Sequence, residues 1–311
     1  MRWRLLAAAA LLLLPGLSAA AAERAVDAGG FPATLAGETS SGPLVVMVAG
    51  SGPTDRDGNN AFGVSAGYLR KLAATLAEQG IASLRYDKRG IPGGAAIPPE
   101  AEVTFGTYVD DLAGVLAWAA AAHPDRPLVL LGHSEGGLVA LRAAGRPGPR
   151  ALAGLVLVAT PGRPPGETLR DQLARLPQPV LGQALAILAA LEAGQPAHAI
   201  PPSLAGLFRP SVQPFLTTLL ALRPAAMLGA LDLPVLVIGG GADIQVGRAD
   251  FDALAAARPD VESRWFASMN HVLTDAPAGF ADNVATYADP DAALTAGLAD
   301  TVAAFARRIG R

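Results

Sequence analysis

Residues 128–140, LVLLGHSEGGLVA, place a serine in a turn between an apolar run and a helical pattern. The run at 128–131 fits a buried strand, and the Leu- and Ala-rich residues after the turn fit a helix. Gly132 and Gly136 complete the order Gly-x-Ser-x-Gly, the pattern of a nucleophile elbow between a strand and a helix. Such a sharp turn leaves little room for Cβ atoms, and glycine has none. The stretch therefore predicts Ser134 as a nucleophile whose hydroxyl a substrate can reach.

Apolar runs alternate with helical patterns on both sides of this turn. The runs that fit buried strands lie at residues 44–49, 81–86, 155–158, 235–238 and 261–266. Helical patterns lie at residues 65–79, 105–122, 248–257 and 289–308. One edge strand is expected near residues 31–35. Strands that alternate with helices at this spacing predict an α/β fold with a mostly parallel, doubly wound sheet between two helical layers.

The alternation stops between residues 161 and 231. Helical patterns surround a Pro-rich interval here, at residues 167–176, 180–193 and 215–221. An insertion between two strands must lie outside the sheet, and Leu-rich helix faces need apolar partners. We therefore expect a core of residues 23–160 and 232–311 with a helical cap at 161–231. A disordered linker is the less favoured alternative.

Residues 1–22 have the order of a secretory signal peptide. Two arginines precede an apolar stretch at residues 5–14, and small residues follow it. The apolar stretch is shorter than the ~20 residues that span a bilayer. We expect cleavage after Ala20 or Ala22, no stable membrane anchor afterwards, and a periplasmic or extracellular location.

The composition excludes several kinds of site. The chain has no cysteine, so it forms neither disulfides nor thiolate sites. Its 24 Lys and Arg stand against 27 Asp and Glu, and no basic run indicates nucleic acid. No histidine pair has metal-ligand spacing, and Gly-Gly-Gly at 239–241 lacks the lysine of a phosphate loop. Neither a metal nor another cofactor is expected.

A serine nucleophile needs a base within hydrogen-bond reach and a third group that orients the base. The chain has four histidines. His133 adjoins the nucleophile and should diverge from it, His123 ends a helix, and His198 lies in the Pro-rich part of the cap. His271 occupies a loop after a late strand, where the order Ser, Asp, His places the base. His271 is therefore the predicted base.

Asp243 is the favoured acid because it follows the run at 235–238, at the carboxyl end of the sheet where open α/β folds bind ligands. An Asp in such a turn could instead only accept backbone N–H bonds, and Glu167 is the second candidate. The oxyanion of acyl transfer needs two backbone donors. The residue after the nucleophile, Glu135, supplies one, and Ser51, between two glycines, is our choice for the other.

Further charged residues accompany the predicted site. Arg56 and Arg89 follow the first two strand patterns, and with Glu135 they could form one buried ionic cluster that braces the loops. Separate solvated charges are the alternative. Asp110 and Asp111 lie near the start of the helix expected at 105–122, where the helix dipole favours acidic side chains.

Five motifs occur in a characteristic order. They are Gly50-Ser51-Gly52-Pro53-Thr54-Asp55-Arg56-Asp57-Gly58, Tyr86-Asp87-Lys88-Arg89-Gly90, Gly132-His133-Ser134-Glu135-Gly136, Asp243-Ile244-Gln245-Val246 and Met269-Asn270-His271-Val272. Together, and with residues 207–214, they resemble the α/β-hydrolase superfamily, most closely a bacterial, often exported branch of serine hydrolases and esterases. Many members have His-Gly where this chain has Ala49-Gly50.

The resemblance covers residue 44 to the C-terminus and implies an α/β-hydrolase fold. It implies Ser134 as nucleophile, Asp243 as acid and His271 as base. The amides of Ser51 and Glu135 would form the oxyanion hole.

The expected activity is hydrolysis of carboxylic esters of small molecules through an acyl-enzyme. An aminopeptidase, a thioesterase or an acyltransferase could use the same triad, and a non-catalytic binding protein could keep the fold. A peptidase for free amines would need carboxylates near its site, and the cap offers few. The complete triad pattern argues against a binding protein.

Overall fold

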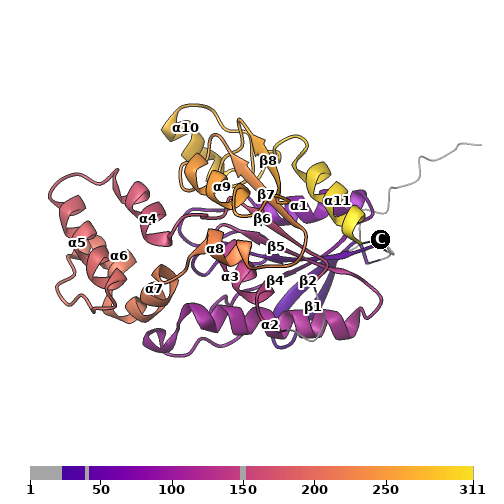
Figure 1. Cartoon of the computed structure of the whole chain (residues 1–311), viewed down its shortest axis with the longest axis horizontal. Helices are drawn as coiled ribbons and strands as arrows, with labels where there is room; N and C mark the ends of the chain where they lie inside the picture. The colour runs from indigo at the N-terminus through magenta and orange to yellow at the C-terminus, as the bar shows by residue number, and fades with distance from the viewer. Residues whose placement is uncertain (1–22, 39–41, 148–151, 311) are drawn as a thin grey trace, which may run out of the picture.

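An eight-stranded sheet forms the centre of the molecule in the computed structural model, which describes residues 23–38, 42–147 and 152–310 (Figure 1). Its strand order is β1-β2-β4-β3-β5-β6-β7-β8. The strands are β1 (Arg24–Asp27), β2 (Pro32–Ala36), β3 (Leu44–Val48), β4 (Ala82–Tyr86), β5 (Leu128–His133), β6 (Gly154–Val158), β7 (Val235–Gly240) and β8 (Glu262–Phe266). From β4 to β8 every neighbouring pair is parallel, which confirms the predicted fold class.

Both faces of the sheet are buried. Along β3 the side chains alternate between two apolar cores, with Val46 in one and Val45 in the other, as the two-residue period of a strand requires. One core is closed by α2 (Phe105–Ala122), α3 (Glu135–Ala144) and α9 (Arg248–Ala255). The other is closed by α1 (Tyr68–Glu78) and α11 (Leu298–Ile309). Among the described helices, none combines the length and apolarity that a membrane span needs.

The amino-terminal edge holds two strands where one was expected. β1 and β2 pair antiparallel, and β2 pairs antiparallel with β4. Gly29 and Gly30 turn the chain between the two strands with positive φ angles of 72° and 92°. The Gly30 amide also donates to the Asp27 carboxylate at 2.6 Å, which closes the turn. The signal-peptide prediction lies outside the described residues.

Five helices lie between β6 and β7. They are α4 (Pro165–Leu173), α5 (Val180–Glu192), α6 (Ala205–Phe208), α7 (Gln213–Leu220) and α8 (Pro224–Gly229), with short 3₁₀ turns at Pro202–Leu204 and Pro210–Val212. In Figure 1, α4 to α7 project beyond the left-hand edge of the sheet. They share an apolar cluster of their own, with Phe208 fully buried in it. Helix α8 instead contributes Leu228 to the core against the sheet, so the insertion returns to the sheet before residue 231.

The helix expected at 289–308 is shorter and is preceded by another. Helix α10 (Phe280–Ala285) leads into a 3₁₀ turn at Thr286–Ala288, and α11 begins only at Leu298. Pro290 and the positive φ of Gly297, +80°, separate the two helices. The intervening chain packs against the loop after β8, where the Thr295 amide donates to the Leu273 carbonyl at 2.8 Å.

Candidate active site

Ser134 occupies a strained turn between β5 and α3. Its φ and ψ angles are 55° and −126°, a conformation that non-glycine residues rarely adopt. The Ser134 amide donates to the Val158 carbonyl of β6 at 2.9 Å, and the Ser134 carbonyl accepts from Gly137 N at 2.9 Å. These hydrogen bonds tie the turn to the sheet on one side and to the helix on the other.

Three glycines allow the turn to pack so closely. A Cβ atom at Gly136 would overlap the carbonyl oxygens at the end of β3, and one at Gly137 would overlap the Thr160 side chain. A Cβ at Gly132 would overlap the backbone of Gly137. Gly132 and Gly136 were expected from the motif. Gly137 was not expected, because the side chain that leaves no room for a Cβ atom there belongs to Thr160, which follows β6.

The side chains of Ser134, His271 and Asp243 form one hydrogen-bonded chain. His271 Nε2 lies 3.0 Å from Ser134 Oγ, and His271 Nδ1 lies 2.8 Å from Asp243 Oδ2. The three residues follow β5, β8 and β7, so they meet at the carboxyl edge of the parallel strands. Because a carboxylate only accepts, Nδ1 carries the proton and Nε2 is left to accept the serine proton. The arrangement can therefore raise the nucleophilicity of Ser134.

Asp243 divides its two oxygens between two tasks. Oδ2 faces His271, while Oδ1 accepts from the amides of Gln245 and Val246 at 2.7 and 2.9 Å. The two interpretations of this residue, turn formation and orientation of the base, are therefore compatible. Glu167 is exposed on α4 and is not the hydrogen-bond partner of His271.

Asn270 braces the His271 loop, and sequence reasoning did not find it. The side chain is fully buried, and Oδ1 accepts from the amides of Val272 and Thr274 at 3.1 and 3.3 Å. Its Nδ2 donates to Asn283 and Thr286 at 3.0 and 2.7 Å. In the sequence, only its position next to His271 could have indicated this role. Its partners Asn283 and Thr286 lie on helix α10 and in the turn after it, and neither element was predicted.

His133 also supports the loop, from the opposite side. A carbonyl only accepts, so the 2.7 Å contact assigns His133 Nε2–H as donor to the His271 carbonyl. Nδ1 is then the acceptor for the Tyr68 hydroxyl, 3.1 Å away. Burial, with His271 nearby, lowers the pKa of His133 well below its ordinary value, so the ring is neutral. Gly58 gives the Tyr68 ring its space, because a Cβ there would lie 2.6 Å from the ring.

Gly50 and Ser51 lie beside Ser134. With Ser134 and His271 they line a pocket of about 120 Å³. A Cβ on Gly50 would stand 3.3 Å from Ser134 Cβ. The Ser51 carbonyl accepts from the Thr54 hydroxyl at 2.7 Å, which fixes the loop. Glu135 is the first residue of α3, and the first N–H groups of a helix have no acceptor within the helix.

Comparisons with known proteins agree with this architecture. A family model described as serine aminopeptidase, S33, matches residues 60–199, a segment that includes Ser134 and ends before Asp243 and His271. Esterase EstD of Thermotoga maritima is 28% identical over 263 residues, which are 81% of this chain and 60% of that protein. The chain thus spans 60% of the length of this curated relative.

Solved structures show the same fold at low identity. An esterase of Pyrococcus furiosus, Pf2001, matches 94% of this chain and 92% of its own, with a TM-score of 0.57 and 16% identity. A proline iminopeptidase of Mycobacterium smegmatis matches 93% of this chain and 99% of its own, with a TM-score of 0.54 and 17% identity. This chain has the α/β-hydrolase fold. The family model and EstD support its place in the α/β-hydrolase superfamily.

Three ion pairs hold the loops of this α/β-hydrolase fold at the site. Arg56 binds Asp87 through its amide at 2.8 Å and its guanidinium at 2.6 Å. Lys88 Nζ lies 3.9 Å from Glu135 Oε1, and Arg89 pairs with Asp111. The expected single cluster of Arg56, Arg89 and Glu135 is therefore wrong, since each residue has a different partner.

Asp110 and Asp111 also act differently from the expectation. The first turn of α2 contains no acidic residue, so the helix dipole does not explain them. Asp111 is buried and pairs with Arg89, whereas Asp110 is exposed and contacts Arg146 at 2.5 Å.

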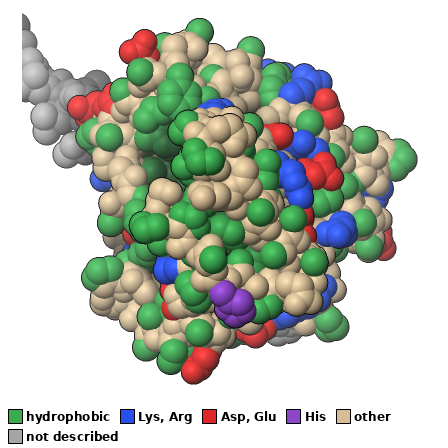
Figure 2. Space-filling model, turned by 90° about the vertical axis from the view of Figure 1, so that its left-hand side faces the viewer, with side chains coloured by type: hydrophobic (Ala, Val, Ile, Leu, Met, Phe, Trp, Pro, Cys, Tyr) green, Lys and Arg blue, Asp and Glu red, His purple; other side chains and the backbone are tan. Residues whose placement is uncertain are grey.

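The insertion touches the loop that carries Asp243. Gln172 Nε2 donates to the Gln245 carbonyl at 3.0 Å, and Arg175 Nη1 donates to the Ile244 carbonyl at 2.7 Å. Arg175 also lies over the Phe280 ring of α10 at 5.5 Å. Figure 2 views the molecule from the left-hand side of Figure 1, where α4 to α7 lie. Acidic and basic side chains lie next to one another on this face, among hydrophobic ones. This face therefore presents no extended field of one sign.

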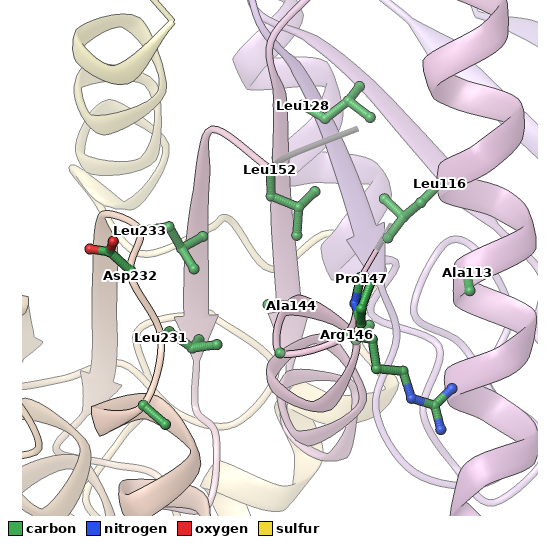
Figure 3. Close-up of a pocket in the computed structure, with 13 residues that line it drawn as sticks. Ala113, Leu116, Leu128, Ala144, Arg146, Pro147, Leu152, Leu231, Asp232 and Leu233 are labelled. Carbon is green, nitrogen blue, oxygen red and sulfur yellow. The ribbon is translucent and has the colours of Figure 1, made fainter. Parts of the chain in front are cut away.

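A larger cavity lies at the opposite end of the sheet. It measures about 670 Å³ and is lined mainly by apolar side chains of α2, of the end of α3 and of the segments that lead into β6 and β7 (Figure 3). Leu128, at the start of β5, forms part of its wall. The cavity is therefore at the amino edge of the strands and is separate from Ser134. Among the described residues, no group of three or more His, Asp or Glu side chains is placed to hold a metal ion.

The buried neutral His133 makes stability depend on pH. An unfolded histidine titrates near pH 6.5, so at lower pH the unfolded chain binds a proton that folded His133 does not. The free energy of unfolding should therefore decrease as the pH falls from about 7 to 5, by up to about 1.4 kcal/mol per pH unit from this residue.

The variant His133→Gln tests this prediction, because glutamine keeps an N–H for the His271 carbonyl and does not titrate. Urea unfolding across this range should show a steeper loss for the wild type. Equal slopes would contradict the assignment.

Proposed function

We propose that this protein is a serine hydrolase that cleaves carboxylic esters with small acyl groups. The observation that carries the proposal is the hydrogen-bonded chain from Ser134 Oγ to His271 at 3.0 Å and from His271 to Asp243 at 2.8 Å. The esterases among the related proteins support the choice of ester substrates.

The chemistry follows from the roles of the three side chains. His271 Nε2 accepts the proton of Ser134 Oγ as the oxygen attacks the ester carbonyl, and Asp243 stabilises the imidazolium that forms. The amides of Ser51 and Glu135 stabilise the negative charge on the tetrahedral intermediate. His271 then protonates the departing alcohol, which leaves an acyl group on Ser134. A water molecule, activated by the same histidine, releases the carboxylic acid and restores the enzyme.

The size of the pocket favours a small acyl group. A closed cavity of about 150 Å³ holds a benzene molecule, and the pocket beside Ser134, which is open to the surface, measures about 120 Å³. No Asp or Glu is found among the described residues that line the pocket, so it offers no carboxylate to a free α-ammonium group. This favours esters over aminopeptidase substrates, the alternative that the description of the matching family model suggests. A thioesterase would use the same steps.

A series of nitrophenyl esters from acetyl to dodecanoyl tests the proposal. We expect turnover to be fastest with acyl chains of two to four carbons and to fall steeply for longer ones. Ser134→Ala should reduce the rate to background while the circular dichroism spectrum is unchanged. A folded wild-type protein that hydrolyses none of these esters, or a Ser134→Ala variant as active as wild type, would refute it.

The acid is tested by a pair of matched substitutions. Asp243→Asn should lower kcat by about 10⁴-fold, because an amide at this position no longer holds His271 in the tautomer that accepts the serine proton. Glu167→Gln, the same chemical change at the exposed candidate, should leave kcat within twofold of wild type. Steady-state kinetics on the best ester decides between the two residues. A large loss of kcat in Glu167→Gln with little change in Asp243→Asn would show that Glu167 is the acid.

We further propose that the protein is exported, to the periplasm or the extracellular space. The proposal rests on the order of charged, apolar and small residues in 1–22. Expression of the full chain in a bacterial host should release a protein that begins at Ala21 or Glu23, as determined by N-terminal sequencing of the exported fraction. An intact amino terminus retained in the cytoplasm would exclude it.

A further inference from the structure

Lys88 is a buried charged residue without a part in the chemistry described above. It follows β4, its side chain is only 4% exposed, and its Nζ donates to the Gly50 carbonyl. The ammonium lies 3.9 Å from Glu135 Oε1 and 5.4 Å from the centre of the Tyr108 ring. It therefore contacts the residue before one proposed oxyanion donor, Ser51, and the side chain of the other, Glu135.

The contact with Gly50 fixes the direction of the Ser51 amide. The Gly50 carbonyl and the Ser51 N–H belong to the same planar trans peptide, so they point in opposite directions. With the oxygen held by Lys88, the N–H must point away from Lys88. Gly50 lies against the nucleophile, and the Thr54 hydroxyl holds the next carbonyl, that of Ser51, at 2.7 Å. The peptide between residues 50 and 51 is therefore restrained on both sides.

The neighbours of Lys88 hold its backbone in place. Asp87 forms an ion pair with Arg56, which lies in the loop after β3 that also holds Gly50 and Ser51. Arg89 forms an ion pair with Asp111 of α2. Three consecutive residues, Asp87, Lys88 and Arg89, therefore form ion pairs with the loop after β3, with α3 and with α2, respectively.

A lysine suits this position better than an arginine. Of the 24 Lys and Arg residues of the chain, only Lys71 and Lys88 are lysines. An ammonium is a compact charge that can be enclosed by one carbonyl, one carboxylate and one ring, whereas a guanidinium is a planar fork with five donors. Burial lowers the pKa of Lys88, and the charge of Glu135 opposes that shift.

We propose that Lys88 is a positioning residue of the oxyanion hole, which directs the Ser51 N–H toward the reacting carbonyl through the Gly50 carbonyl. The ammonium also adds a fixed positive charge near both residues that supply the amide donors, where negative charge develops in the transition state. The inference rests on the proposed hydrolase function of Ser134.

Lys88→Met tests the inference, with Lys71→Met as the matched control. Lys71 donates to the Ala292 carbonyl at 2.6 Å, outside the site. For Lys88→Met we expect kcat on the best ester to fall by about 10- to 100-fold, less than the 10²–10³ lost with a whole oxyanion donor, and KM to stay within about threefold. A boronic acid, which forms a tetrahedral adduct with the serine, should bind more weakly by a similar factor. Lys71→Met should change neither quantity.

A second variant covers a failure to fold. Lys88→Met leaves Glu135 unpaired, so the double variant Lys88→Met/Glu135→Gln removes both charges and keeps the Glu135 backbone amide. It should show the same loss of kcat and of boronic acid affinity. Wild-type values of both quantities in either folded variant would overturn the inference. If the wild type turns over no ester but binds the boronic acid, the boronic acid affinities of the wild type and the Lys88 variants still test the role of Lys88. If the wild type does neither, the proposed function itself has failed.

Discussion

The backbone of Ser134 is the constraint on which the site depends. A residue held at a φ of 55° costs of order 1–3 kcal/mol and persists only where its surroundings impose it. Here the sheet supplies the amide partner, and Gly136 and Gly137 let α3 approach β3 and Thr160 without Cβ atoms in between. The same close approach brings Gly50 into contact with Ser134. The distance between these two residues is therefore set by how closely the turn at Ser134 packs.

The loops around the elbow are held by buried polar groups that are paired. Asn270 uses both ends of its amide, Asp243 uses both oxygens, and His133 uses both ring nitrogens. An unpaired group at any of these positions would carry the cost of lost hydration without compensation. This pairing holds the loops around Ser134 in place.

Local patterns in the sequence predicted the fold class and the residues that meet at the site. The apolar runs and the elbow motif predicted the parallel sheet, and elimination among four histidines pointed to His271, which the structure brings to Ser134. The sequence assigned no role to Asn270, Tyr68 or Lys88, because the partners of these residues are distant in the chain. Helices α8 and α10 were missed because short helices bounded by Pro and Gly have little periodicity, and Ala-rich residues past Pro290 were read as helix although the chain there is a loop.

The separate apolar cluster of α4 to α7 has an evolutionary consequence. Its buried side chains pack against one another, and the helices reach the loop of Asp243 through side-chain donors to backbone carbonyls, which place few demands on the residues that accept them. Two other contacts are specific to their residues: Thr168 of α4 donates to the buried Asp250 at 2.8 Å, and Phe215 of α7 packs against the core beside the sheet. Substitutions in these helices away from those contacts can then accumulate while the sheet keeps Ser134, Asp243 and His271 in register. Such a division lets a lineage vary these helices without rebuilding the edge of the sheet where the three side chains meet.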